Sequence, residues 1–293
     1  QEREKKMSKH IMGQGIRIET IEELNSLPSP KPMGSKHYPI RDDEFFPCLE
    51  ENIVPHKWSI TRREYLLDCN MREVCGHLVE DGPEWHRYFN SGGPKWNTFA
   101  LYELESDTQD YTRIVAGRNS STQHFKAELG AGNQVTVCSN LMFYASVVVG
   151  RKHTRHIMRD LPVLMNKGMQ RISDEFVNQD RRIEAYKETY LTTKDADHII
   201  MSTLRDQGIP SSHIKPWMQE YTDPSHEEFQ SRTAWSLQNA FTEVGKRWSF
   251  NDLSQRTCKL TSVMDKLLGV TPVNTDLINI DGVEDVEVSD NTL

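Results

Sequence analysis

Apolar residues change their spacing within Phe143-Tyr-Ala-Ser-Val-Val-Val-Gly150-Arg-Lys-His-Thr-Arg-His-Ile157-Met-Arg-Asp-Leu161-Pro-Val-Leu164, and this change sets the class of fold. Before Gly150 the run is rich in aromatic and β-branched residues, which is typical of a β-strand. After Gly150 the apolar residues recur about every 3.6 positions, at Ile157, Leu161, Leu164, Met165, Ile172 and Phe176. The stretch therefore predicts a strand that leads directly into a long amphipathic helix.

Three more strands are predicted upstream. Runs of aromatic and β-branched residues occupy 96–104, 111–117 and 134–138, and the polar residues 105–110 are typical of a hairpin connection. Ser139 and Asn140 indicate a turn or bulge before the fourth run, 143–149. We expect an α+β fold, with a small antiparallel sheet of about four strands packed against helices and an all-helical C-terminal half.

Capping signals predict where the helices begin. Thr61 and Glu64 have the spacing of a capping box and precede apolar residues at helical intervals, so residues 61–80 are expected to form an amphipathic helix. Three further helices are expected in the C-terminal half, at 195–207, 225–248 and 254–268. Trp235, Phe241 and Trp248 have helical spacing and are expected to pack inward.

The chain divides into three parts by composition. Residues 1–55 are charged and then Pro-rich, which predicts an N-terminal arm with one short helix after Thr20 and little core of its own. Residues 56–268 are expected to form the α+β core domain. Residues 269–293 are acidic and predict a flexible tail.

Charge is distributed unevenly along the chain. The net charge is −8, which argues against a protein that coats nucleic acid through global positive charge. Six acidic residues and no basic ones lie in 271–293, so the other 270 residues carry only −2. Between Ala145 and Ile172, six Lys and Arg residues oppose Asp160 alone, a local charge of +5. The sequence therefore has a basic centre and an acidic end.

Cysteine usage and hydropathy indicate a cytoplasmic protein. The five cysteines form no CxxC pair, which predicts reduced thiols. No run of apolar residues approaches the ~18 needed to span a membrane, and the first six residues lack the apolar segment of a secretory signal. We expect no membrane partner.

The basic centre is the first candidate binding site. If 150–159 is helical, Arg151, Arg155 and Arg159 lie on one face, opposite the apolar stripe, with Lys152 beside them. Guanidinium groups suit bidentate contacts with phosphates, so this face is a candidate phosphate-backbone track. The alternative is a solvated basic face of a helix.

A second candidate lies at Gly117-Arg-Asn-Ser-Ser121, after a predicted strand. Gly, Asn and Ser permit backbone angles that expose N–H groups to an anion, and Arg118 and Lys126 add positive charge. An ordinary turn is the alternative. The cluster lacks the spacing of a nucleotide phosphate-binding loop, so no nucleotide hydrolysis and no cofactor are predicted.

Strand aromatics have two interpretations. Exposed aromatic rings beside arginines stack unpaired bases in many single-strand binders. Strand aromatics are more often part of a core. About two of six are expected at a surface, among Trp96, Phe99, Tyr102, Tyr111, Phe143 and Tyr144.

Metal sites are the weaker alternatives. His153 and His156 form an HxxH pair for which His124 and Cys138 are conceivable further zinc ligands, but no established zinc-motif spacing is present. Acidic residues near the first hairpin are candidate ligands for Mg²⁺ in phosphodiester cleavage, namely Glu103, Glu105, Asp107 and Asp110. Solvated surface acids are the alternative there.

Several short motifs resemble one known family. They are Val115-Ala-Gly-Arg-Asn-Ser120, Val135-Thr-Val-Cys-Ser-Asn-Leu141, Gly150-Arg-Lys-His-Thr-Arg155 with the following Arg159-Asp-Leu-Pro162, and Arg232-Thr-Ala-Trp-Ser-Leu-Gln-Asn-Ala-Phe-Thr-Glu243. In the same order they resemble the phage- and plasmid-like family catalogued as domain of unknown function 932, over about residues 55–268. The resemblance implies a mobile-element context, in the cytoplasm of a bacterium or of a phage-infected host cell, and transfers no catalytic residue.

The order helix, antiparallel strands, long helix is also similar to the core of Rad52-like single-strand annealing proteins. Together these features favour a phage or mobile-element protein that binds single-stranded DNA in replication or recombination without nucleotide hydrolysis, and they are compatible with a homo-oligomer. Its backbone contacts are expected to be Arg118, Lys126, Arg151, Lys152, Arg155 and Arg159. The alternatives are a metal-dependent nuclease and an interaction protein directed at a host defence system, whose acidic face would mimic DNA. Catalytic activity is left undecided.

Overall fold

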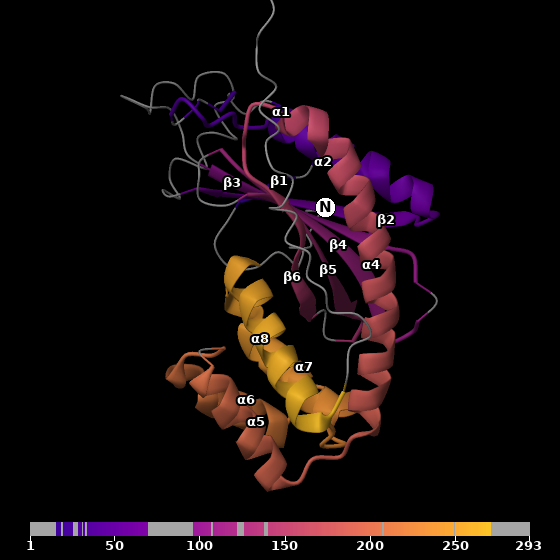
Figure 1. Cartoon of the computed structure of the whole chain (residues 1–293). Helices are drawn as coiled ribbons and strands as arrows, with labels where there is room; N and C mark the ends of the chain where they lie inside the picture. The colour runs from indigo at the N-terminus through magenta and orange to yellow at the C-terminus, as the bar shows by residue number, and fades with distance from the viewer. Residues whose placement is uncertain are drawn as a thin grey trace, which may run out of the picture.

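A computed structural model gives the fold of the chain, drawn in Figure 1. It describes residues 16–18, 20–25, 29–30, 32, 34–69, 96–106, 108–121, 126–137, 140–206, 208–248 and 250–270. The acidic residues 271–293, and with them nearly all of the predicted tail, lie outside the described residues.

Among the described residues, one antiparallel sheet forms the N-terminal half and helices form most of the C-terminal half, so the predicted α+β class is confirmed. The sheet contains six described strands rather than about four, and each pairs with its neighbour in chain order. The strands are β1 (Ile16–Ile18), β2 (Ile60–Cys69), β3 (Trp96–Leu104), β4 (Tyr111–Ser120), β5 (Ala127–Val135) and β6 (Leu141–Arg151). Strands were correctly predicted at β3, β4 and β6.

The helix predicted at 61–80 is wrong in its described part, because residues 60–69 form β2 between β1 and β3. Tyr65, Leu66 and Leu67 are all buried, with Leu66 in one core cluster and its two neighbours in the other. A strand covered on both faces has no alternation of apolar and polar residues to reveal it. Residues 70–80 lie outside the described residues.

The third predicted strand, 134–138, is misplaced. The observed strand β5 is Ala127–Val135, with the sequence Ala-Glu-Leu-Gly-Ala-Gly-Asn-Gln-Val, and every residue in it is buried. Small residues have low strand propensity, so the pattern did not show a strand there. Pairing with β4 on one side and β6 on the other supplies the hydrogen bonds that hold it extended.

Helices cover both faces of the sheet. One core cluster joins α1 (Ile21–Asn25), α2 (Asp42–Ile53) and the first half of α4 (Ile157–Glu188) to one face. The other joins the opposite face to the C-terminal helices. In Figure 1, α4 runs the length of the molecule, with α2 beside its first half and the C-terminal helices at its far end.

The N-terminal region contributes more core than expected. The prediction that residues 1–55 add little to the core is wrong for α2, whose Phe45, Phe46, Leu49 and Ile53 are all fully buried. The short helix α1 does begin after Thr20, and the Glu23 N–H donates to the Thr20 hydroxyl over 3.3 Å. Sequence composition hid α2 because the surrounding segment is polar and rich in proline.

Close packing of α2 on β4 depends on a glycine. A Cβ atom on Gly117 would stand 2.6 Å from Leu49 Cδ2 and 3.4 Å from Phe45 Cε1. Gly117→Ala is therefore expected to lower the free energy of unfolding by about 1–3 kcal/mol in urea denaturation, because these side chains are fully buried and must shift. In a Leu49→Ala background the clashing methyl is gone, and the same substitution should cost much less. Equal costs in both backgrounds would contradict this account.

The C-terminal half consists of α5 (Thr193–Arg205), α6 (Ile214–Thr222), α7 (Ala234–Val244) and α8 (Phe250–Leu268) after the 32-residue helix α4. The stripe predicted for α4 is confirmed, because all six of its apolar residues are buried. Helices α5 and α8 lie close to their predicted ranges, whereas α6 was not predicted.

Helix α7 begins later than predicted. It is capped by Thr233, whose hydroxyl accepts the Ser236 N–H, while Glu227–Phe229 forms a separate 3-10 turn. The helix expected from Ser225 is therefore wrong at its start. Trp235, Phe241 and Trp248 are buried, as their spacing predicted.

Candidate nucleic-acid interface

Strand pairing brings the two basic clusters to the same end of the sheet. Arg118 of β4 is paired with Glu128 of β5, and Ala127 of β5 is paired with Arg151 of β6. The two clusters lie about 30 positions apart in sequence but only two strands apart in space. We call this region the basic end, defined by Arg118, Lys126, Arg151, Lys152, Arg155 and Arg159.

Arg118 is paired with an acidic residue of the sheet, and Lys126 is close enough for its charge to act on the same carboxyl. Arg118 forms an ion pair with Glu128, and the Arg118 side chain is only 18% exposed. Burial raises the pKa of the Glu128 carboxyl, while the charges of Arg118 and Lys126 act to lower it. The charge of Arg118 is therefore largely balanced by Glu128 within the protein. A phosphate would have to compete with Glu128 for the Arg118 guanidinium group.

The predicted helical face of three arginines is wrong. Arg151 is the last residue of β6, residues 152–156 form a turn, and α4 begins at Ile157. The Ile157 N–H donates to the Thr154 carbonyl, which places the chain reversal before the helix. Sheet pairing of Arg151 with Ala127 holds this residue extended, so a helix cannot include it.

Asp160 draws two of the arginines toward the start of α4. Its Oδ2 atom lies 3.2 Å from Arg151 Nη2, and its Oδ1 atom accepts a hydrogen bond from Arg159 Nε over 2.9 Å. Arg151 is largely buried, whereas the Arg159 side chain is 70% exposed. Lys152 and Arg155 are exposed as well. The cations most accessible to a ligand are therefore Lys152, Arg155 and Arg159.

An N-terminal segment packs against this turn. The Tyr38 N–H donates to the His153 carbonyl over 2.9 Å, and the His37 ring stacks on the His153 ring, with centroids 5.6 Å apart and planes 11° from parallel. Both histidines are buried, and burial lowers the pKa of His153 to about 4, with a smaller contribution from His37. This contact places exposed Lys36 and Tyr38 beside the basic end. Sequence reasoning missed both, because residues 34–40 have no periodicity.

The predicted anion-binding turn at 117–121 is wrong, because residues 117–120 belong to β4 and the side chains of Asn119, Ser120 and Ser121 are buried. Asn119 donates to Asp42 Oδ1 over 2.8 Å, and the Trp96 indole and Thr98 hydroxyl donate to Asp42 Oδ2 over 2.9 and 2.8 Å. Burial raises the pKa of Asp42, while these three hydrogen bonds act to lower it. The cluster anchors the first residue of α2 to the sheet.

The strand aromatics do not form a surface platform in the described part of the sheet. Trp96, Phe99, Tyr102 and Tyr111 are each at most 3% exposed, because helices cover both faces. The side chains of Phe143 and Tyr144 lie outside what the structure describes.

The candidate metal ligands are not gathered where the structure describes them. His153 stacks on His37 while His156 is exposed, and Glu103 lies 4.0 Å from Arg62 while Asp110 binds Lys187. Within the described ranges, no group of three or more His, Cys, Asp and Glu residues is arranged to hold a metal ion. His124, Cys138 and Asp107 lie outside those ranges.

A buried charged group lies between α4 and α8. Arg182 Nε is 3.1 and 3.0 Å from the two carboxylate oxygens of Asp265, and Arg182 Nη1 is 3.6 Å from Glu175. The Tyr186 hydroxyl also donates to Asp265 over 2.6 Å. Burial raises the pKa of both carboxyls, while Arg182 acts to lower it. Arg182 is 5% exposed, so we interpret this group as structural.

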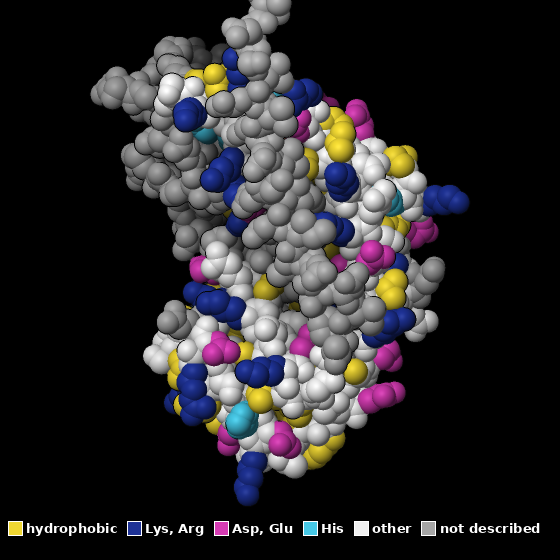
Figure 2. Space-filling view, in the orientation of Figure 1, with side chains coloured by type: hydrophobic (Ala, Val, Ile, Leu, Met, Phe, Trp, Pro, Cys, Tyr) yellow, Lys and Arg dark blue, Asp and Glu magenta, His cyan; other side chains and the backbone are white. Residues whose placement is uncertain are grey.

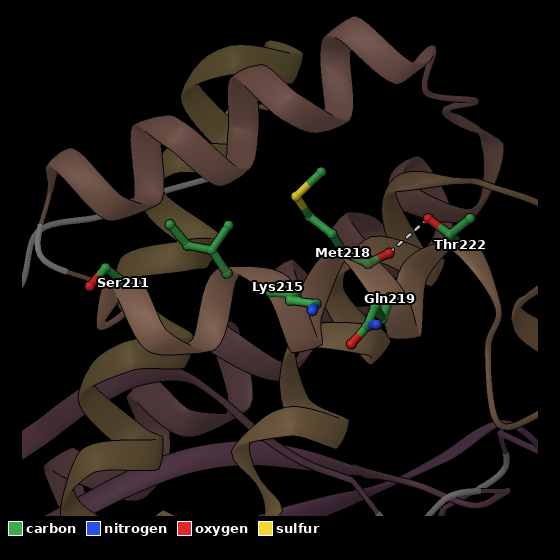
Figure 3. Close-up of a pocket in the computed structure, with 6 residues that line it drawn as sticks. Ser211, Lys215, Met218, Gln219 and Thr222 are labelled. Atoms are coloured by element: carbon green, nitrogen blue, oxygen red, sulfur yellow. Dashed lines mark hydrogen bonds between the residues drawn. The ribbon is translucent and has the colours of Figure 1, made fainter.

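The helical half offers a different kind of surface. A hollow of about 560 Å³ follows one side of α6, lined by Ser211, Ile214, Lys215, Met218, Gln219 and Thr222. Figure 3 shows these side chains along the helix, with the Thr222 hydroxyl donating to the Met218 carbonyl. The lining contains one cation, no acid and no paired nucleophile and base, and Figure 1 places α6 at the opposite end of the molecule from α1.

Surface charge differs between the two ends. On the face shown in Figure 2, Lys and Arg side chains gather in the upper part, whereas both signs alternate over the lower, helical part. The upper part corresponds to the end of the molecule at which α1 and the start of α4 lie. A ligand with repeated negative charges would therefore be attracted to that end.

No protein-family model, curated protein or solved structure matches the chain. The resemblance to domain of unknown function 932 therefore stays a prediction from the motifs. Among the described helices, none is long and apolar enough to cross a membrane.

Proposed function

We propose that the protein binds single-stranded nucleic acid, and specifically single-stranded DNA, through the basic end of the sheet. The observation that carries the proposal is the turn at 152–156 with the start of α4, which presents Lys152, Arg155 and Arg159 to solvent beside Arg151. Against these four cations, 151–160 contains one acidic residue, Asp160. A net local charge of +3 on a short exposed segment suits a row of backbone phosphates.

The geometry favours backbone contact over sequence-specific base contact. Lysine and arginine side chains bind phosphates without distinguishing bases, and the described strand aromatics are buried. The rest of the proposal is carried by the sequence motifs. It is a context in phage or mobile-element replication or recombination, without nucleotide hydrolysis and compatible with self-association.

Removing the exposed cations tests the proposal. The triple variant Lys152→Ala, Arg155→Ala, Arg159→Ala is expected to bind labelled oligo(dT) on the order of 10–100-fold more weakly at about 0.1 M salt, measured by fluorescence anisotropy. The plot of log affinity against log salt concentration should also become shallower by about 2, because each phosphate contact with a single strand contributes about 0.7 to the slope.

A matched variant provides the control. Lys194→Ala, Arg205→Ala, Lys215→Ala removes the same charge from exposed positions on α5 and α6 and should bind almost as the unaltered protein does. In a parallel set of proteins, the acidic residues of 271–293 are replaced by Asn or Gln. This prevents the acidic segment from competing with DNA for the basic end. Absence of salt-sensitive binding with both the native and the neutralised sequence would refute the proposal.

A further inference from the structure

Tyr38 is an exposed aromatic residue in a molecule that buries most of its described aromatic side chains. It is 42% exposed, and Tyr190 at 65% is the other tyrosine among the exposed large hydrophobic residues of the described chain. The two lie in different places, since Tyr190 follows α4 at the end far from the basic end. An exposed ring beside exposed cations calls for a ligand that has both a flat apolar surface and negative charge.

The backbone of Tyr38 is fixed from several directions. Its N–H is held by the His153 carbonyl, and the preceding His37 is stacked on His153. On the other side, Ile40 is buried and its carbonyl accepts the Asn119 amide over 3.0 Å. The backbone of this segment is therefore anchored to the 152–156 turn, and Tyr38 lies beside the residue that follows Lys152 in the chain. An anchored backbone reduces the entropy that binding through the Tyr38 side chain costs.

We infer that Tyr38 stacks on an unpaired base of the strand whose phosphates contact Lys152, Arg155 and Arg159. This inference rests on the proposed function and deepens it, because it assigns the base-contacting residue and a reason for preferring single strands. In a duplex the bases are already stacked on each other, so their flat surfaces are not accessible to Tyr38. Any base offers a flat surface, so the contact carries little sequence preference.

Substitution of the ring separates stacking from charge. Tyr38→Leu is expected to weaken oligo(dT) binding about ten-fold at fixed salt, and to leave the salt dependence of the affinity unchanged because no cation is lost. Tyr38→Phe and Tyr38→Trp should bind as tightly as the native protein. Tyr190→Leu, which removes the other exposed ring, should have no effect on affinity.

An abasic oligonucleotide of the same length provides the decisive comparison. It carries the phosphates and lacks the bases, so the native protein and Tyr38→Leu should bind it equally. The inference would be overturned if the native protein and Tyr38→Leu bound oligo(dT) equally. It would also be overturned if Tyr38→Leu lost as much affinity for the abasic strand as for oligo(dT). The proposed function would survive that result if the triple cation variant still lost its salt-sensitive binding, and it would fail separately if no form bound either strand.

Discussion

Arg182→Leu is expected to lower the free energy of unfolding by about 3–5 kcal/mol at neutral pH. Arg182 lies between the partly buried carboxyl of Glu175 and the buried carboxyl of Asp265 and contacts both through its guanidinium group. Removing it leaves two carboxyls between α4 and α8 with no arginine to balance their charge. The variant is expected to unfold at a much lower urea concentration than the native protein.

The pH dependence of this loss has a definite sign. Burial already raises the pKa of Asp265 and Glu175, and Arg182 opposes that rise. Without Arg182, both carboxyls should have still higher pKa values in the folded state than in the unfolded state. A group of this kind favours folding at low pH, and the benefit disappears as the pH rises through its folded pKa. The deficit of Arg182→Leu should therefore be smaller at pH 5 than at pH 7.

Two further variants check the explanation. Adding Asp265→Leu to Arg182→Leu removes one of the unbalanced charges and should recover a large part of the lost stability. Glu184→Ala breaks the exposed pair with Lys187 on the same helix and is expected to cost at most about 1 kcal/mol. If Arg182→Leu cost no more than Glu184→Ala, the buried group would not be a major source of stability.

Acidification is expected to remove about 3 kcal/mol of stability through His153. Its pKa is about 4 in the folded protein against 6.5 when unperturbed, and each unit corresponds to 1.36 kcal/mol. Because the folded pKa is the lower one, this stability is fully present above pH 6.5 and is lost progressively as the pH falls to about 4. The cause is burial beside His37, which makes protonation of His153 costly.

His153→Phe isolates this contribution. Between pH 7 and pH 4 the native protein should lose about 3 kcal/mol more unfolding free energy than the variant. Urea denaturation at each pH measures this difference. At pH 7 the variant should be about as stable as the native protein, because both ring nitrogens of His153 are buried without a hydrogen-bond partner among the described residues. His198→Phe at an exposed position of α5 serves as the control. Parallel pH profiles for the native protein and His153→Phe would contradict the assignment.

Strands with ordinary composition and helices with a clear stripe could be predicted from the sequence. Strand β3 has aromatic and branched residues, and the first half of α4 has six buried apolar positions at helical spacing. Strand β2 was taken for a helix because Thr61 and Glu64 have the spacing of a capping box, while the adjacent buried residues Tyr65–Leu67 give no strand-like alternation. Strand β5 was misplaced because Gly and Ala give no strand signal, although pairing on both sides holds it extended.

The candidate site also has features that the sequence predicted and features that only the folded chain could show. Residue types and charge runs identified Lys152, Arg155 and Arg159, which are exposed as a binding role requires. Sequence spacing could not show that Arg118 is paired with Glu128 or that Arg151 approaches Asp160, because those partners are set by strand register and by the start of α4. The accessible cations are therefore a subset of the six predicted ones.

Local sequence was sufficient to determine that the chain is an α+β protein with a basic centre, because periodicity and charge are properties of neighbouring residues. Two sets of long-range contacts required the folded chain. They are the hydrogen bond between Tyr38 and His153, and those from Trp96, Thr98 and Asn119 to Asp42. These partners lie 54–115 positions apart, and such contacts form only when strand pairing and core packing have placed both segments. Hydrogen-bond register and burial, rather than residue type, decided which charges remain at the surface.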